Sequence, residues 1–120
     1  MIEMILAALL GLKQPDKPRI IPAVTPPEAS VEVLDPFDVV WGELAKEARQ
    51  IQWCESRNDP NATNGIHIGL FQINYKIWGK EYGVTREQLF IPEINWQIAR
   101  NIYSRTNSWG AWSCKKVLRY

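Results

Sequence analysis

The sequence predicts a mainly α-helical domain that follows a proline-rich linker. Two stretches place apolar residues three or four positions apart, as on one face of an amphipathic helix: one from Val40 to Ile51, the other from Ile94 to Ile102. Five of the eight prolines fall within residues 13–35, a stretch without helical or strand periodicity. Such a segment is typical of an extended linker.

The composition is that of one small globular domain. The 120 residues leave no room for a second sizeable core. Hydrophobic residues make up 46% of the chain and charged residues 22%, which is ordinary for a globular protein. The net charge is +1 and both signs are interspersed along the chain. We therefore expect no nucleic-acid partner.

The chain divides into three predicted parts. Residues 1–12 form an apolar segment that is too short to span a bilayer as a helix, so no stable membrane span is expected there. They lack a positive start and a small-residue cleavage site, and whether they act as a signal peptide is left open. Residues 13–35 are the linker. Residues 36–120 are the folded domain, which begins where Asp35 caps a helix with Pro36 at its first position.

The first helix is predicted to run from Pro36 to about Glu55, because the turn-forming residues 58–61 follow it. Within it we assign Trp53 to the core. Glu55 then lies at the C-terminal end of a buried helix, where the helix dipole disfavours a negative charge. This position is a plausible way to raise the pKa of an acid.

The remaining elements are shorter, except the last helix. Residues 61–69 are predicted to form a loop, and Leu70–Trp78 a short helix or irregular turn that ends at Gly79. Thr85 and Gln88 have the spacing of a capping box that opens a short helix. Pro92 is predicted to start a longer helix that stops around Asn107.

Two cysteines, Cys54 and Cys114, enclose nearly all of the notable residues. An even pair in a small domain favours one disulfide in an oxidising compartment, although two reduced thiols remain the alternative. A disulfide would close a loop of about 60 residues and stabilise the fold by roughly 4 kcal/mol in the chain-entropy model. Two cysteines and one histidine do not complete a usual metal site, so we expect no metal or other cofactor.

Six tryptophans are many for a chain of this length. They could build a tryptophan-rich core, or they could line a groove that stacks on flat, weakly polar ligands such as sugars. Trp78, Trp109 and Trp112 are the candidates for such a groove wall.

Four motifs occur in order and at suitable spacing, and together they resemble the lysozyme-like domain of soluble lytic transglycosylases. They are Cys54-Glu55-Ser56, Asp59-Pro60-x-Ala62-x-Asn64, Gly69-Leu70-Phe71-Gln72-Ile73-Asn74 and Pro92-x-x-Asn95. The ending Trp109-Gly110-Ala111-Trp112-x-Cys114 is also similar to the resuscitation-promoting factors of that superfamily. The resemblance covers about residues 37–114.

The resemblance implies cleavage of the β-1,4 bond between N-acetylmuramic acid and N-acetylglucosamine in peptidoglycan, with the glycan strands as partner. It implies that Glu55 is the catalytic acid, and that Asn95 helps to hold the last helix. The residues expected to bind substrate or support the acid are Ser56, Asn64, Gln72, Asn74, Tyr103 and Trp109. An extracytoplasmic location follows: secreted, wall-associated or virion-associated. Partners in a secretion, conjugation or phage apparatus stay open.

The sequence departs from the family pattern at two positions. Many transglycosylases carry a Tyr seven residues after the Asn that matches Asn95, where this chain has Ile102. Tyr103 lies one residue further, about 100° around a helix, and could serve only if the register shifts. The Asp that c-type lysozymes place before the glycine-led segment is replaced by His67.

The residues favour a reaction with one carboxylate. Glycosidases normally use two, yet no Asp or Glu occurs between Pro60 and Lys80, where a partner is expected. One acid suffices if the 2-acetamido group of the substrate attacks its own anomeric carbon and a 1,6-anhydro sugar is formed. Three alternatives stay open: a hydrolytic muramidase, a glycan-binding or assembly module without activity, and an unrelated tryptophan-rich interaction domain.

Overall fold

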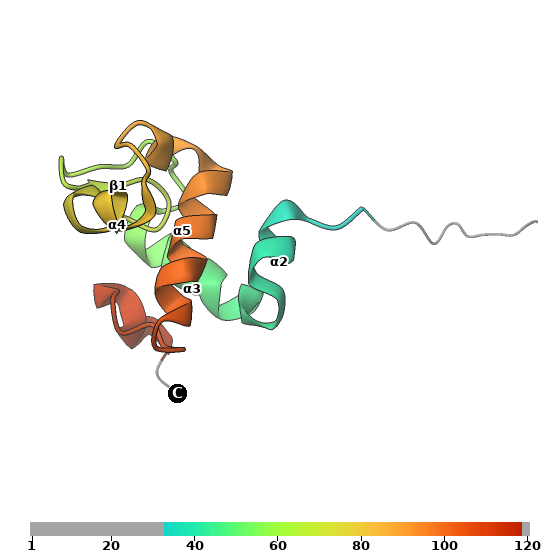
Figure 1. Ribbon diagram of the computed structural model, residues 1–120. Helices are drawn as coiled ribbons and strands as arrows, with labels where there is room; N and C mark the ends of the chain where they lie inside the picture. Colours follow the sequence, from blue (N-terminus) through green and yellow to red (C-terminus); the bar gives the residue numbers. More distant parts are fainter. Residues whose placement is uncertain (1–32, 119–120) are drawn as a thin grey trace, which may run out of the picture. The chain divides into compact units, whose positions relative to one another are not determined.

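The computed structural model describes residues 33–118, and their fold is mainly helical (Figure 1). The predicted apolar segment 1–12 and nearly all of the predicted linker 13–35 lie outside these residues. The described chain contains two longer helices, α3 (Ala45–Ser56) and α5 (Pro92–Ser104), a shorter helix α2 (Pro36–Trp41), and one small antiparallel sheet. The mainly α-helical class predicted from the sequence is therefore confirmed.

The folded part starts at the predicted cap. Helix α2 spans Pro36–Trp41, and the Asp35 carboxylate accepts a hydrogen bond from the Phe37 N–H at 2.9 Å. The single helix predicted from Pro36 to Glu55 is wrong, because the chain breaks at Gly42, whose φ of 55° suits a residue without Cβ. A short 3₁₀ turn, Gly42–Leu44, leads into the next helix. The apolar spacing continues through this break, which is why the periodicity did not reveal it.

Helix α3 spans Ala45–Ser56 and ends as predicted beside Glu55. Its buried face includes Ala48, Ile51 and Gln52. The assignment of Trp53 to the core is wrong, since its side chain is 51% exposed with the Arg57 guanidinium 5.2 Å from the ring centre. One residue step turns a helix by about 100°, which carries Trp53 off the face that buries Gln52.

A two-stranded sheet follows, where a loop and a turn were predicted. Strand β1, His67–Ile68, pairs antiparallel with β2, Ile73–Asn74. The π-helical turn Tyr75–Gly79 continues directly into the short helix α4, Lys80–Tyr82. The helical run thus ends at Gly83, with φ 68°, rather than at Gly79. Strands of two residues are too short to leave a periodic signal.

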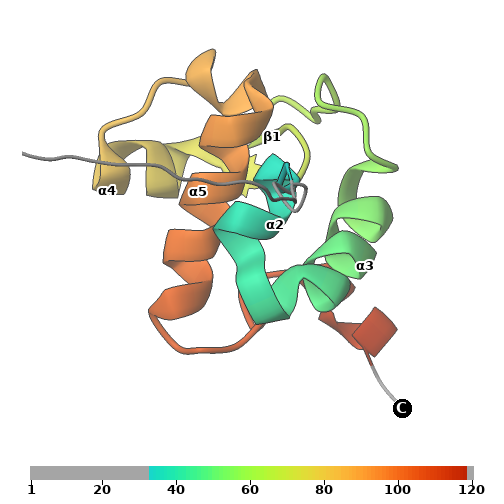
Figure 2. The same cartoon turned by 90° about the vertical axis from the view of Figure 1, so that its right-hand side faces the viewer.

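The C-terminal part agrees with the remaining predictions. The capping box is present, because Thr85 Oγ1 accepts from the Gln88 N–H at 3.0 Å and Gln88 Oε1 accepts from the Thr85 N–H at 2.8 Å. The 3₁₀ turn Gln88–Phe90 leads to α5, Pro92–Ser104, and the chain turns on through residue 107. The last element is the 3₁₀ helix Ser113–Leu118. Helix α2 packs against both α3 and α5 (Figure 2).

Part of the core is a cluster of aromatic side chains. Trp41 lies 5.2 Å, between ring centres, from both Phe71 and Trp109, and Trp109 lies 5.3 Å from Trp112. These tilted and edge-on contacts are the arrangements that aromatic pairs prefer. The cluster joins the first helices to the segment before the last element, and so fixes the chain around residues 109–112 against the rest of the domain.

Asn95, predicted to help hold the last helix, holds the turn before β2 from inside the core. Its side chain is fully buried and makes three hydrogen bonds: Oδ1 accepts from the Phe71 N–H, and Nδ2 donates to the carbonyls of Ile68 and Leu89. Gly69 allows this approach, since a Cβ built there would meet Asn95 Nδ2 at 2.6 Å. The glycine-led segment is therefore anchored to α5.

Candidate functional site

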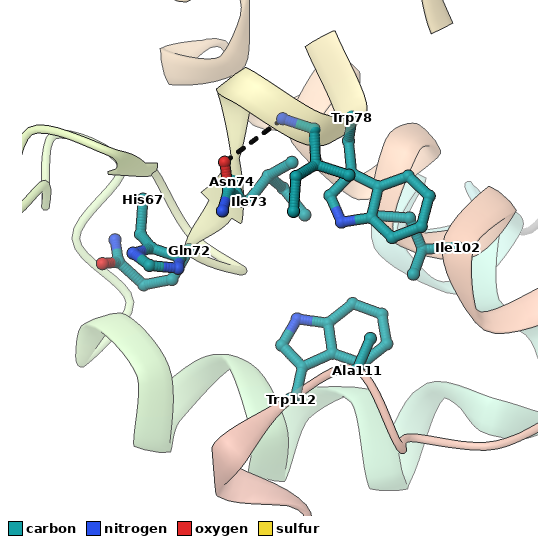
Figure 3. A pocket seen from close by; sticks show the side chains of 9 residues that line it. His67, Gln72, Ile73, Asn74, Trp78, Ile102, Ala111 and Trp112 are labelled. Atoms are coloured by element: carbon teal, nitrogen blue, oxygen red, sulfur yellow. Dashed lines mark hydrogen bonds between the residues drawn. The ribbon is translucent and has the colours of Figure 1, made fainter. Parts of the chain in front are cut away.

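A cavity of about 300 Å³ opens between the small sheet, the π-helical turn, α5 and the segment before the last element (Figure 3). This volume is at the lower end of the range for small-ligand sites. The lining is mixed, with apolar side chains and a few amide and imidazole groups. It consists of His67, Gln72, Ile73, Asn74, Ile77, Trp78, Ile102, Ala111 and Trp112.

Two indole rings form opposite walls of the cavity. Figure 3 shows Trp78 and Trp112 facing each other across it. Trp112 is buried and its Nε1 donates to the Phe71 carbonyl at 2.9 Å, which fixes the ring. Trp78 is partly exposed and stacks on Tyr82 with 6.1 Å between ring centres. These two predicted wall residues thus line a cavity whose faces suit a flat ligand.

Gln72, predicted to face the glycan cleft, lines this cavity, and its backbone is unusual. It adopts φ 49°, the left-handed region that non-glycine residues rarely occupy. Its Nε2 donates to the carbonyls of Ala62, at 3.0 Å, and Gly69, at 2.8 Å. Among the described residues no donor reaches its Oε1, so this oxygen is available to accept from a ligand.

Asn74 presents hydrogen-bond donors to the cavity. Its Oδ1 accepts from the backbone N–H groups of Lys76, at 3.0 Å, and Ile77, at 3.3 Å, and one such bond is drawn in Figure 3. These two donors fix which end of the amide carries the oxygen. Within residues 33–118 the Nδ2 hydrogens have no partner, and Nδ2 can donate to a ligand carbonyl.

His67 and Asn64 form one polar unit at the edge of the sheet. His67 Nδ1 lies 3.2 Å from Asn64 Nδ2 and 3.3 Å from Asn64 Oδ1, and which contact is a hydrogen bond depends on the tautomer. Asn64 Oδ1 also accepts from the His67 N–H at 2.8 Å. His67 lines the cavity, whereas Asn64 does not and instead orients the loop that carries His67.

Glu55 is the acid next to this cavity. It is half-buried, and burial raises the pKa of its carboxyl above the ordinary 4.5, although the Cys114 N–H and the nearby His67 act in the opposite direction. One carboxylate oxygen accepts from the Cys114 N–H at 3.3 Å. Glu55 does not itself line the cavity. It interacts electrostatically with the lining residue His67 and accepts from the backbone two residues after the lining residue Trp112.

The disulfide between Cys54 and Cys114 is present, with an S–S distance of 2.07 Å. It connects α3 to the last element, and the two also pack against each other. Because Cys54 precedes Glu55 in the chain, this cross-link fixes the backbone beside the acid.

Three other predicted residues lie away from the cavity. The Ser56 hydroxyl is buried and donates to the Gln52 carbonyl at 3.1 Å, inside its own helix. Trp109 is in the core, where its Nε1 donates to Glu47 at 2.8 Å. Tyr103 packs on Trp109 with 4.8 Å between ring centres. Helix α5 is continuous through Tyr103, and Ile102 is the residue that lines the cavity.

Ile73, Ile77 and Ala111 line the cavity and were not predicted as site residues. Ile73 and Ile77 belong to the apolar segment Leu70–Trp78, which was predicted only as a short helix or irregular turn. Ile77 is 56% exposed, so its side chain offers the ligand an apolar contact rather than filling the core. Ala111 lies between Gly110 and the wall residue Trp112. This position next to a predicted wall residue was the one feature of the sequence that could have indicated that Ala111 lines the cavity.

No Asp or Glu lines the cavity. Within the described residues no group of three His, Cys, Asp or Glu side chains could hold a metal ion. In the same part of the chain no helix has the length and apolar character needed to cross a membrane. No family model, no curated protein and no solved structure matches this chain.

Proposed function

We propose that this protein is a lytic transglycosylase that cleaves the β-1,4 bond between N-acetylmuramic acid and N-acetylglucosamine in peptidoglycan. The observation that carries the proposal is the setting of Glu55: a half-buried acid with a raised pKa that interacts electrostatically with His67, a lining residue of a cavity that no carboxylate lines. A raised pKa keeps an acid protonated nearer to neutral pH, as general-acid catalysis requires.

In the first step Glu55 donates its proton to the glycosidic oxygen as the C1–O bond of the muramic sugar breaks. The carbonyl oxygen of the 2-acetamido group of that sugar attacks C1 and forms an oxazolinium ring. Asn74 Nδ2, which has no partner among residues 33–118, is placed to hold this acetamido group. The substrate thereby supplies the nucleophile that a second carboxylate supplies in other glycosidases.

In the second step the Glu55 carboxylate removes the proton from the 6-hydroxyl of the same sugar. O6 attacks C1, the bond from C1 to the acetamido oxygen breaks, and a 1,6-anhydro sugar results. Glu55 is protonated again and no water is consumed. One residue thus acts first as acid and then as base, and a pKa near the working pH serves both roles.

The cavity walls support a glycan ligand. Sugars present flat apolar faces edged by hydroxyl groups, which suits the indoles of Trp78 and Trp112 together with the amides of Gln72 and Asn74. One sugar ring occupies the cavity, and the bond to be cleaved lies at its edge beside Glu55. An extracytoplasmic location is part of the proposal, since disulfides persist in oxidising compartments and peptidoglycan lies outside the cytoplasm.

The test is digestion of purified peptidoglycan by the full chain, with the released muropeptides identified by mass spectrometry. A transglycosylase gives products lighter by one water than the reducing-end products of a hydrolase. Ordinary reducing ends would replace the proposal with a hydrolytic muramidase. Absence of release would replace it with a glycan-binding module without activity.

A further inference from the structure

A second hollow, of about 530 Å³, shares the π-helical turn Tyr75–Gly79 with the first cavity. Some residues of this turn line the first cavity and others line the second hollow. Ile77 and Trp78 line the first cavity, whereas Lys76 and Gly79 line the second. The two hollows therefore adjoin the same turn.

The second hollow is cationic. Lys76, Lys80 and Arg86 line it, and no carboxylate does. The acid of helix α4, Glu81, pairs instead with Arg105 at 3.2 Å. Within residues 33–118 neither lysine forms an ion pair, and both side chains are exposed. Three positive charges thus meet in one hollow without a counter-charge from the described chain.

The guanidinium of Arg86 is restrained by contacts with two aromatic rings. Its guanidinium carbon lies 5.9 Å from the centre of the Tyr75 ring and 5.5 Å from that of Phe90, at cation–π distances. The neighbouring Thr85 hydroxyl accepts from the Gln88 N–H at 3.0 Å, which leaves its own hydrogen free to be donated. A guanidinium restrained by two rings loses little freedom when it binds an anion.

We propose that this hollow binds the carboxylates of the peptide stem that peptidoglycan carries on its muramic sugar. The inference rests on the proposed function, because the stem is attached to the sugar whose bond Glu55 cleaves. The stem presents a few separate carboxylates, which matches three cations confined to one hollow. A long phosphate polymer would call for a continuous basic track, whereas the charges of this chain are interspersed. The hollow thus selects glycan strands that carry peptide stems over bare strands.

The test compares soluble glycan strands that carry stems with the same strands stripped by an amidase. Binding is measured with the Glu55→Gln variant of the full chain, so that the strands stay intact, and turnover is measured with the active protein. The test variant is Lys76→Gln/Lys80→Gln. The control is Lys46→Gln/Lys116→Gln, which removes the same charge from two exposed lysines that line neither hollow.

We expect stem-bearing strands to bind about fivefold more weakly to the test variant, because two partly exposed ion pairs each contribute roughly two- to threefold. Stripped strands should bind both variants equally, and added salt should weaken only the stem-dependent part. Equal affinity of the two variants for stem-bearing strands, or an equal loss on both substrates, would overturn the inference.

Two further outcomes keep this inference separate from the proposed function. Cleavage of stripped and stem-bearing strands at equal rates would leave the transglycosylase standing and remove the stem site. Failure to bind or cleave either strand would remove both. A competition experiment adds either free stem peptide or a glycerol-phosphate polymer at the same concentration of charge. If only the phosphate polymer displaces the strands, the hollow binds phosphate, and the inference is overturned.

Discussion

The backbone N–H of Cys114 donates to the carboxylate of Glu55 at 3.3 Å, while the sulfur of Cys114 is bonded to the residue that precedes Glu55. The cross-link and the hydrogen bond therefore act on the same short stretch of α3. The hydrogen bond favours the charged carboxylate and burial favours the neutral acid, and burial is the larger effect on the pKa. The disulfide thus joins the acid's chain neighbour to the residue whose N–H lowers the pKa of the acid.

The raised pKa of Glu55 predicts how folding stability depends on pH. Between the ordinary value of 4.5 and the raised value, the folded state binds more protons than the unfolded state. The contribution of Glu55 to stability is therefore full below pH 4.5 and is lost as the pH rises through the folded-state pKa. Glu55→Gln should lack this fall, so thermal unfolding of the two proteins should differ more at pH 7 than at pH 4. Glu43→Gln, at an exposed position, should follow the wild type. A wild-type melting temperature that rises relative to Glu55→Gln above pH 4.5 would contradict the prediction.

Loss of the disulfide should lower the free energy of unfolding by about 4 kcal/mol, because it closes a loop with a sequence separation of 60 residues. Urea denaturation of the wild type with and without reductant measures this. The double variant Cys54→Ser/Cys114→Ser should match the reduced wild type and should not respond to reductant. A loss below about 1 kcal/mol would mean that the packing of the last element against α3 supplies most of the constraint.

Gly69→Ala should be far more destabilising than Gly65→Ala. Both glycines have positive φ, 77° and 99°, so both substitutions introduce backbone strain of about 1–2 kcal/mol. At Gly69 the new Cβ would also meet Asn95 Nδ2 and the Leu89 carbonyl at 2.6 Å, whereas at Gly65 nothing lies within 4 Å. We expect a loss of about 3 kcal/mol or more at Gly69, because buried hydrogen bonds of Asn95 are disturbed. Equal losses in urea denaturation would show that Asn95 does not hold this turn.

Trp78→Ala should weaken glycan binding about tenfold, since the loss of an aromatic wall removes roughly 1.5 kcal/mol of contact. Trp53→Ala is the matched control, because Trp53 is also partly exposed and does not line the cavity. The measurement is the KM for soluble glycan strands, with kcat followed in parallel. If Trp53→Ala raises KM and Trp78→Ala does not, the glycan lies elsewhere on the domain.

The helices were predictable from the capping residues at their ends and from the spacing of apolar residues along one face. Asp35 with Pro36, and Thr85 with Gln88, are local signals that need no tertiary information, and both caps are present. The break at Gly42 was missed because apolar spacing continues through it. The two-residue strands were missed because pairing between His67–Ile68 and Ile73–Asn74 depends on contacts outside the segment.

The position of a site residue was predictable where it follows from the local helix or turn that carries the residue. It was less predictable where packing between elements determines which side chains reach the cavity. Glu55 follows from the end of α3, and Gln72 and Asn74 from the glycine-led segment. Trp109 and Trp112 are three residues apart and looked equivalent. Both are buried, but Trp109 donates to Glu47 and does not line the cavity, whereas Trp112 does. The side of α3 that faces the core likewise depends on packing with other elements, which left Trp53 misplaced.

The most direct measurement is the rate at which the full-length wild type, Glu55→Gln and Glu43→Gln release 1,6-anhydro muropeptides, with strand binding measured in parallel. We predict that Glu55→Gln loses at least about a thousandfold in rate, since general acid–base catalysis contributes about 10²–10⁴-fold and one residue here performs both steps. It should still bind glycan strands like the wild type, and Glu43→Gln should be unchanged in both respects. Anhydro products released by Glu55→Gln at the wild-type rate would contradict the central claim.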